Sequence, residues 1–300
     1  MIHEFKKRIK GKVLLNERLS RHTTFRIGGP ADIWVEPYDT RELKAIYLFA
    51  QESHIPLFII GGGSNILVND TGVPGIVVHL GSPYFKKASV KGRTVTVGAG
   101  YSVAALVRLS CQEALAGMES LVGIPGTVGG ALYMNAGGST NPIYKNISDF
   151  LTSVKAMDHE GNIKTLKKSE IKFGYRKSSL ASYTILQAAF RLDRGDRAVL
   201  VSSCKKFLNM KRQKQALDVP SAGCAFKNPE NFQFTCGQMI DMLGLKGKKI
   251  GGAGISEKHG NFIVNSDKAS AGDVMKLIDF VKEKVKENYN IDLELEIKIV

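Results

Sequence analysis

No run of about 20 consecutive apolar residues, the length that a helix needs to cross a bilayer, occurs anywhere in the sequence. The first twelve residues, MIHEFKKRIKGK, are basic, but the apolar stretch of a secretory signal does not come after them. We therefore expect a cytoplasmic protein without membrane insertion.

Cysteine is scarce and scattered. The four cysteines, Cys111, Cys204, Cys224 and Cys236, form no CxxC pair and have no histidines at zinc-ligand spacing. This spacing argues against a zinc site and against a disulfide framework. We expect free thiols and no bound metal.

Two common nucleotide-binding motifs are also missing. A glycine cluster occurs at residues 61–63, but the residues after it, ILVNDTGVP from position 66, cannot begin the helix that a Rossmann GxGxxG motif opens. No GxxxxGK[ST] sequence occurs after a strand, which excludes a Walker loop.

Acidic residues are outnumbered, since 42 Lys and Arg oppose 28 Asp and Glu for a net charge of +14. This balance attracts phosphate-bearing partners of any kind. The basic clusters at 205–206 and 246–249 lack interleaved aromatic residues and match no nucleic-acid motif. We favour a dispersed basic surface or an anionic small substrate over nucleic-acid binding.

The length of 300 residues suits about two domains with a cleft between them. Apolar periodicity predicts helices over 39–53, from Ser102, around 201–208 and behind a capping box at Ser270 and Asp273. Short strands are predicted at 56–60, 66–68, 76–80 and 94–97, and 291–300 alternates as a strand with one buried and one charged face. A charged turn at 193–197 marks the expected domain boundary.

Two glycine-rich loops could approach a phosphate closely, because glycine allows positive φ and exposes backbone N–H groups. The first, GGGSN at 61–65, taken alone is better explained as a tight turn between two strands. The second, GIPGTVGGALYMNAG at 123–137, is dense enough in glycine to predict an elaborate loop rather than a helix or a strand interior.

Together with RHTTFRIGGPA at 21–31, these loops resemble the UDP-N-acetylenolpyruvoylglucosamine reductase family. The resemblance continues through FGYRKS at 173–178, PSAGCAFKNP at 220–229, GNFIVN at 260–265 and the terminal LELEI pattern. It covers essentially the whole chain in order, so coincidence is a poor explanation.

The resemblance implies an α+β fold with an FAD-binding domain of the vanillyl-alcohol oxidase and p-cresol methylhydroxylase type. On this basis we expect the FAD-binding domain at 1–193, in two α+β subdomains divided near residue 80. A smaller α+β domain at 194–300 would bind the UDP-sugar substrate. In the family, NADPH reduces bound FAD, and UDP-N-acetylglucosamine enolpyruvate is then reduced to UDP-N-acetylmuramate for peptidoglycan synthesis.

That chemistry needs a cation to stabilise charge that develops beside the substrate carboxylate, and an acid to protonate carbon. The resemblance gives these catalytic roles to Arg176, Cys224 and Glu296. Arg176 suits the carboxylate because guanidinium stays charged and binds it through two hydrogen bonds. Read from the residues alone, Arg176 could be a surface charge, and Glu294 and Glu296 could both be solvated on the charged face of the last strand.

The remaining site residues also come from the resemblance. Those expected to bind FAD lie in or next to the two loops: Gly61, Gly62, Gly63, Ser64, Asn65, Gly123, Pro125, Gly126, Gly129, Gly130 and Asn135. Those expected to bind substrate are Tyr175, Lys214 and Asn228. Tyr175 could instead be a core tyrosine, and Lys214 could be a surface lysine.

The chain departs from the family pattern at three places. Cys224 stands where the most often described member has serine, and a thiol with a pKa near ~8.5 is the stronger acid of the two. Ala216 replaces a usual proline, which loosens the alignment at Lys214. The short stretch between Arg176 and Arg191 leaves no room for the tyrosine loop of one subtype, so we assign the chain to the shorter subtype.

Two other functions stay open from the sequence: a related flavin oxidase acting on an alcohol or carbohydrate, and a basic protein that binds nucleic acid. The colour of the protein and its bleaching by NADPH or by an alcohol separate them. The sequence does not give the oligomeric state, although we favour a monomer.

Overall fold

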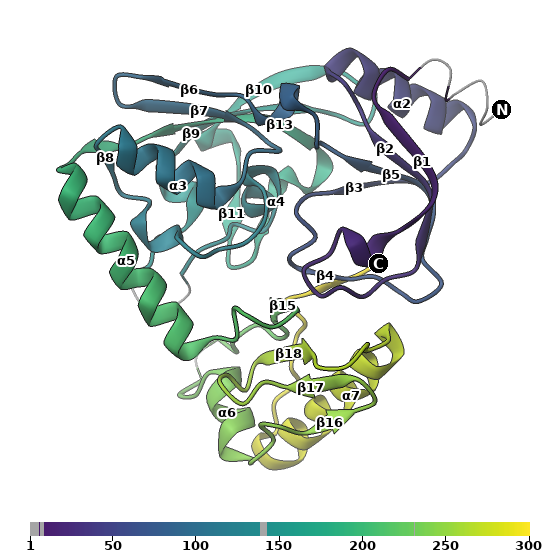
Figure 1. Ribbon diagram of the computed structural model, residues 1–300, viewed down its shortest axis with the longest axis vertical. Helices are drawn as coiled ribbons and strands as arrows, with labels where there is room; N and C mark the ends of the chain where they lie inside the picture. The colour runs from purple at the N-terminus through teal and green to yellow at the C-terminus, as the bar shows by residue number, and fades with distance from the viewer. Residues whose placement is uncertain (1–5, 7–8, 139–142, 231) are drawn as a thin grey trace. The chain divides into compact units, whose positions relative to one another are not determined.

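A computed structural model describes residues 6, 9–138, 143–230 and 232–300, and its chain divides into two compact units (Figure 1). The first unit comprises the described part of Met1–Leu15 with Ile33–Gly62 and Gly75–Asn209. The second comprises Asn16–Asp32, Gly63–Pro74 and Met210–Val300. Most of the basic N-terminal segment discussed above lies outside the described residues.

The smaller sheet of the first unit has the strand order β1-β2-β5-β3. Its strands are β1 (Lys12–Arg18), β2 (Pro30–Glu36), β5 (Val73–His79) and β3 (Leu57–Ile60), and boundaries between the units fall within β1, β2 and β5. Helix α2 (Thr40–Glu52) begins at Asp39, whose carboxylate accepts hydrogen bonds from the amides of residues 41 and 42. Leu43 and Ile46 of α2 are fully buried in the core of this unit.

The larger sheet of the first unit is antiparallel, with the strand order β10-β9-β13-β7-β6. Its strands are β6 (Ala88–Lys91), β7 (Thr94–Gly98), β9 (Leu151–Met157), β10 (Ile163–Lys167) and β13 (Thr184–Arg191). Figure 1 shows α3 (Val103–Gln112) and α4 (Val128–Tyr133) on the same side of this sheet. Helix α4 packs on β13 and β7, so the sheet supports the second glycine-rich segment.

Short elements complete the first unit. Strands β8 (Leu115–Ala116) and β14 (Asp193–Arg194) pair, as do β11 (Phe173–Gly174) and β12 (Lys177–Ser178). Helix α5 (Arg197–Lys214) contains the boundary between the units at residues 209 and 210. Among the described residues, 3-10 turns lie at Leu19–Arg21, Pro83–Lys86, Glu119–Leu121, Ile147–Phe150, Lys168–Glu170 and Ser179–Ser182.

The second unit is built on an antiparallel sheet with the order β15-β18-β17-β16. Its strands are β15 (Ser221–Cys224), β16 (Lys249–Ile250), β17 (Ala253–Ile255) and β18 (Phe262–Asn265). Helix α7 (Ala271–Tyr289) packs against β16, β17 and α6 (Cys236–Met242). Its apolar positions, spaced as the sequence predicts, are buried: Val274, Leu277, Ile278, Val281 and Val285.

A segment far away in the sequence closes the N-terminus of α7. The two carboxylate oxygens of Asp70 accept hydrogen bonds from the amides of Ala271, at 2.9 Å, and Gly272, at 3.1 Å. Ser270 and Asp273 form the predicted capping box at the same helix end. These contacts explain why residues 63–74 group with the C-terminal unit, together with the parallel pairing of β4 (Ile66–Leu67) and β19 (Lys298–Ile299).

Most of the predicted elements are confirmed, and two expectations need correction. Residues 291–300 do not form one continuous strand, because only Lys298–Ile299 is a strand and Leu295 makes an isolated bridge. The segment 123–137 is not all loop, since it contains α4.

The compact units do not coincide with a single boundary at residue 193. Most of α5 packs with the first unit, and residues 16–32 and 63–74 group with the second. The N-terminal half of the chain therefore contributes to both units. None of the described helices is both long and apolar enough to span a membrane.

Candidate active site

The two glycine-rich loops meet in the first unit. A Cβ atom built on Gly62 would lie 2.6 Å from the Cα atom of Gly126, and one on Gly61 would lie 2.8 Å from the Thr127 hydroxyl. Real Cβ atoms do not approach other atoms so closely. Glycine at 62 is therefore required because backbone of the second loop fills the space of a side chain, while at 61 the Thr127 side chain fills that space. The sequence did not reveal either relation.

The backbone of the second loop is held by α3 and the residues before it. The amide of Val103 donates to the carbonyl of Gly126 at 3.1 Å, and the amide of Gly129 donates to the carbonyl of Ala99 at 2.9 Å. A Cβ on Gly129 would lie 3.1 Å from the Cβ of Ala99. Since a protein acceptor already uses the Gly129 amide, this glycine contributes close packing rather than a hydrogen-bond donor for a ligand.

Asn135 connects the second loop to the β11–β12 hairpin. It is buried, has a φ of 48°, and donates from Nδ2 to the carbonyl of Gly174 at 3.1 Å. Its Oδ1 atom is also buried and, among the described residues, accepts no hydrogen bond. Because unsatisfied buried acceptors are rare, a donor from a ligand is a natural partner for this atom.

The turn between β11 and β12 carries Tyr175 and Arg176. Arg176 has a φ of 54°, and its guanidinium carbon lies 5.0 Å from the centre of the Tyr175 ring, a cation–π contact. The Nη1 atom of Arg176 is buried, so Arg176 is not the exposed surface charge that the sequence left open. Positive φ in a non-glycine residue often marks a functional site.

The rest of the first loop belongs to the second unit. Gly63 has a φ of 60°, and a Cβ there would lie 2.0 Å from the carbonyl oxygen of His22. The amide of Thr24 donates to the carbonyl of Gly63 at 3.0 Å, while its hydroxyl donates to the carbonyl of Ser221 at 2.7 Å. Thr24, from the RHTTF motif, thus joins the first loop to β15.

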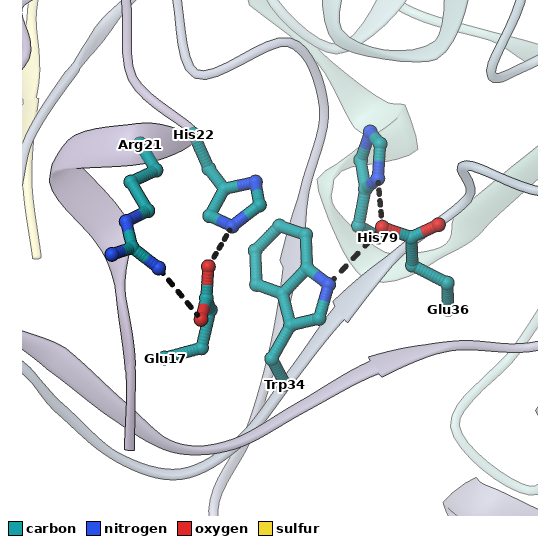
Figure 2. A network of polar contacts seen from close by, with 6 residues as sticks. All are labelled: Glu17, Arg21, His22, Trp34, Glu36 and His79. Carbon is teal, nitrogen blue, oxygen red and sulfur yellow. Dashed lines mark hydrogen bonds and ion pairs between the residues drawn. The ribbon is translucent and has the colours of Figure 1, made fainter. Parts of the chain in front are cut away.

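Figure 2 shows two groups of polar contacts, one made by Glu17 and one made by Glu36. In the second unit, Glu17 accepts a hydrogen bond from His22 Nε2 at 2.9 Å and forms an ion pair with Arg21. In the first unit, Glu36 accepts from the indole of the fully buried Trp34 at 3.2 Å. Glu17 therefore fixes the imidazole ring of His22. The backbone carbonyl oxygen of His22 fills the space that a side chain at position 63 would need.

Cys224 and Glu296 come from adjacent backbone segments of the second unit. Cys224 ends β15, and the amide of Glu296 donates to the carbonyl of the next residue, Ala225, at 2.8 Å. Asn65 of the first loop donates from Nδ2 to the carbonyl of Glu296 at 3.0 Å. The first loop and the segment of Cys224, far apart in the sequence, therefore meet at Glu296.

The exposure of Glu296 differs from the sequence expectation. Glu296 is buried, with a relative exposure of 9%, whereas the Glu294 side chain is 72% exposed and pairs with Lys227. The strict alternation fails because the segment turns after its bridge at Leu295. Burial distinguishes the two glutamates, which the sequence alone left equivalent.

Cys236 lies close to Glu296, and its backbone is bonded to Asn228. The Oδ1 atom of Asn228 accepts from the amide of Cys236 at 3.1 Å, and the Cys236 thiol donates to the carbonyl of Lys227 at 2.8 Å. Burial, with the charge of Glu296 as a second cause, raises the pKa of Cys236 to about 12. Cys236 is therefore a protonated, structural thiol beside the candidate carboxylate.

The other predicted residues are less enclosed. Lys214 is the exposed last residue of α5, while Lys211, one turn earlier, has its pKa lowered to about 8 by burial. Cys111 and Cys204 are free thiols whose sulfur atoms lie 3.4 Å apart in the first unit. Arg176 belongs to the first unit, and Cys224, Asn228 and Glu296 belong to the second.

Sequence reasoning missed Asn261. This residue is 3% exposed, and its carboxamide accepts from the amide of Phe226 at 2.9 Å and donates to the carbonyl of the same residue at 2.8 Å. The motif GNFIVN supports only the family resemblance. A buried position for a polar amide cannot be read from that pattern, although Asn beside an apolar strand is a weak signal.

The fold and these loops define a class, the FAD-binding flavoproteins. Residues 31–167 match the FAD binding domain family, and a plant chain, Physcomitrella patens BBE-like 1, matches in fold alone, with a TM-score of 0.50 at 18% identity over 65% of this chain and 44% of that chain. Residues 214–300 match the C-terminal domain of UDP-N-acetylenolpyruvoylglucosamine reductase. Since a full-length member is 40% identical over the whole chain, the chain belongs to the UDP-N-acetylenolpyruvoylglucosamine reductase family.

Full-length relatives support this membership. The chain is 40% identical to the UDP-N-acetylenolpyruvoylglucosamine reductase of Bacillus subtilis (strain 168), covering 100% of this chain and 98% of the relative. It is 40% identical to that of Moorella thermoacetica, covering 97% and 94%. The crystal structure of the reductase from Thermus caldophilus superposes with a TM-score of 0.82 at 34% identity, covering 97% of this chain and 99% of that one. The expected α+β fold with an FAD-binding domain is confirmed.

Proposed function

We propose that this protein uses bound FAD and NADPH to reduce UDP-N-acetylglucosamine enolpyruvate to UDP-N-acetylmuramate, a precursor of peptidoglycan. The observation that carries the proposal is the hydrogen bond between the Glu296 amide and the Ala225 carbonyl, which puts a buried carboxylate beside the segment of Cys224 in a chain of this family. FAD, when bound, supplies the hydride that NADPH provides.

The residues of the first unit fit FAD. Gly62 lets the backbones of the two loops approach closely, Gly61 leaves room for the Thr127 hydroxyl, and the buried Asn135 Oδ1 offers an acceptor. A pyrophosphate binds to backbone N–H groups that side chains do not cover. We therefore assign FAD to both loops, with contacts expected from Gly61, Gly62, Gly63, Ser64, Asn65, Gly123, Pro125, Gly126, Gly130 and Asn135, while Gly129 supports the loop by packing.

Arg176 is proposed to bind the carboxylate of the enolpyruvyl group. A guanidinium stays charged whatever its surroundings and can hold a carboxylate with two parallel hydrogen bonds. The contact with the Tyr175 ring restricts how the guanidinium can point. A fixed cation stabilises charge that develops on the carboxylate more effectively than a mobile one, because it needs no reorganisation.

Cys224 is proposed to protonate carbon, with Glu296 assisting. A thiol is a stronger acid than a serine hydroxyl and can give up its proton more easily. The buried Glu296 would stabilise the proton-donating arrangement, since its backbone is fixed by Ala225 and Asn65. Cys236 does not compete for this role, because its thiol is buried and bonded to a carbonyl.

Tyr175, Lys214 and Asn228 are proposed to bind the UDP-sugar. Because the Oδ1 atom of Asn228 accepts from the Cys236 amide, its Nδ2 group is the part suited to a phosphate or sugar oxygen. Lys214, exposed at the end of α5, suits the diphosphate by charge. We keep the functional division proposed from sequence, with FAD binding in 1–193 and substrate binding in 194–300.

The same chemistry indicates the compartment. UDP-sugars and NADPH are metabolites of the cytoplasm, so we propose that the reaction occurs there. No partner beyond these two small molecules is needed for the proposed reaction.

The test measures the two half-reactions separately. Purified protein should be yellow, NADPH should bleach it without oxygen, and the enolpyruvyl UDP-sugar should restore the colour. Cys224→Ala should leave bleaching nearly intact and slow recolouring by about 10²-fold or more, the contribution of a general acid, while Cys224→Ser should keep much of the rate.

Cys204→Ala, a change of the same kind in the first unit, serves as the matched control and should leave both steps unchanged. Equal losses in both steps for Cys224→Ala would reject its role as acid. Protein that takes up no FAD would reject the reductase, and bleaching by an alcohol instead of NADPH would favour a flavin oxidase.

A further inference from the structure

The backbone that comes after Cys224 lies outside the regular sheet, and its polar groups depend on Asn261. Strand β15 ends at Cys224, which pairs with Phe262 of β18. Beyond this pair, the amide of Ala225 donates to the backbone carbonyl of Asn261 at 2.8 Å. The Asn261 carboxamide then accepts a hydrogen bond from the Phe226 amide at 2.9 Å and donates one to the Phe226 carbonyl at 2.8 Å.

The opposite side of the same segment contacts the C-terminal residues. Glu296 donates its amide to the Ala225 carbonyl, and Lys227 donates its amide to the Glu294 carbonyl, both at 2.8 Å. Residues 225–227 therefore lie between Asn261 and residues 294–296. The side chain of Asn261 does what a neighbouring strand would do, since it offers one acceptor and one donor to a single extended residue.

This arrangement determines how Cys224 and Glu296 are spaced. Phe226 is 1% exposed, so its backbone groups have no access to water if the carboxamide is lost. A shift of residues 225–227 would displace Cys224, which directly precedes them. It would also displace the Ala225 carbonyl, to which the Glu296 amide donates. Proton transfer to carbon tolerates little misplacement, and errors of about 1 Å cost about 10²-fold in rate.

We propose that Asn261 is a positioning residue that holds Cys224 and Glu296 in register for proton delivery, through its paired hydrogen bonds to the backbone of Phe226. The inference rests on the proposed function and deepens it. Asn261 does not contact the substrate in this role. It acts through the Cys224–Lys227 segment.

The test uses Asn261→Asp with Asn265→Asp as a closely matched control. Aspartate at 261 keeps the acceptor for the Phe226 amide but loses the donor to the Phe226 carbonyl. Asn265 is the last residue of β18, the strand that begins directly after Asn261. It accepts from the Ala269 amide at 2.8 Å and donates to the Phe25 carbonyl at 3.1 Å, so aspartate there loses one equivalent donor. Its bonds do not touch residues 224–228.

At pH 8, Asn261→Asp should recolour with the enolpyruvyl UDP-sugar about 10- to 100-fold more slowly than the unchanged protein, with NADPH bleaching within twofold. Asn265→Asp should be normal in both steps. When the pH falls, the introduced carboxyl group becomes protonated and regains an O–H donor, so the rate of Asn261→Asp should recover toward that of the unchanged protein. Effects of pH on the rest of the site are common to all three proteins, so the comparison with Asn265→Asp removes them.

A second readout does not depend on flavin or substrate. The alkylation rate of Cys224 by iodoacetamide, followed by peptide mass spectrometry, should change in Asn261→Asp and not in Asn265→Asp. Normal recolouring and normal alkylation in Asn261→Asp, or equal defects in both variants, would overturn the inference. If the unchanged protein is not recoloured by the enolpyruvyl UDP-sugar, the proposed function fails, and the alkylation comparison still decides whether Asn261 positions Cys224.

Discussion

Replacing Gly62 with alanine adds one methyl group where the two glycine-rich loops touch. That methyl would lie 2.6 Å from the Cα of Gly126, 3.2 Å from its carbonyl carbon and 3.3 Å from the amide nitrogen of Thr127. All three neighbours are backbone atoms, which cannot rotate away as the end of a side chain can. Gly62 is not among the residues with positive φ, so alanine itself suits the local conformation and the clash acts alone.

The size of the effect can be worked out from these distances. The nearest contact is about 0.8 Å shorter than the 3.4 Å at which ordinary van der Waals contact begins, so the loops must separate by about that amount. Overpacking of this kind costs about 1–3 kcal/mol of stability. If FAD requires the loops in their joined arrangement, the same free energy weakens FAD binding by about 5- to 150-fold, since ~1.4 kcal/mol is tenfold.

Gly272→Ala is the control. Gly272 lies in α7, outside the two loops, and a Cβ there meets only the Ser270 hydroxyl, at 3.6 Å, and an Asp70 carboxylate oxygen, at 3.9 Å. Alanine inside a helix should leave stability equal or raise it by about 0.5–1 kcal/mol. FAD titration of the apoprotein by flavin fluorescence measures the affinity, and urea unfolding measures the stability. Equal FAD affinity and equal stability in Gly62→Ala and Gly272→Ala would refute the reasoning.

Two further predictions concern stability. Asp70→Ala should lower the free energy of unfolding by about 0.5–2 kcal/mol, because it removes two hydrogen bonds and a negative charge at the N-terminus of α7. Asp267→Ala, at an exposed position, is the control and should change the free energy of unfolding, measured in urea, by less than about 0.5 kcal/mol. Equal losses in the two variants would contradict this account. Burial, with Lys246 as a second cause, lowers the pKa of His259, so the unfolded chain takes up its proton first as pH falls. The stability contributed by neutral His259 is complete above pH ~6.5 and lost below it. The midpoint temperature of thermal unfolding should therefore fall less between pH 7 and 5 in His259→Gln than in the unchanged protein. An identical fall in both proteins would exclude His259 as the cause.

Local features of the chain could be predicted from the sequence because local physics dictates them. The capping box at Ser270 and Asp273 and the apolar spacing behind it predict α7 without knowledge of its partners. Asp39 and Ser102 likewise begin α2 and α3, where their side chains accept hydrogen bonds from helix amides. Capping and periodicity involve residues within one or two turns, so the pattern alone contains the information.

Partnerships between distant segments could not be predicted in this way. Nothing in GGGSN says that Gly62 meets Gly126, and nothing near Asp70 indicates a helix about 200 residues later. The alternation at 291–300 predicts the same environment for Glu294 and Glu296, yet one is exposed and the other buried. Alternation describes a strand with a uniform neighbour on each face, and the C-terminal segment has two different neighbours, Ala225 and Asn65.

The sequence by itself determined the family, through ordered motifs over the whole chain, and with it the α+β fold and the expected cofactor. It also determined the individual helices, since their caps and apolar faces are local. Only the tertiary structure decided which glycines are required by contact between the two loops, which glutamate is buried, and that Asn261 holds the backbone beside Cys224. The reason is physical: burial and hydrogen bonding between segments far apart in the chain depend on the packing of the whole unit, and no local pattern contains them.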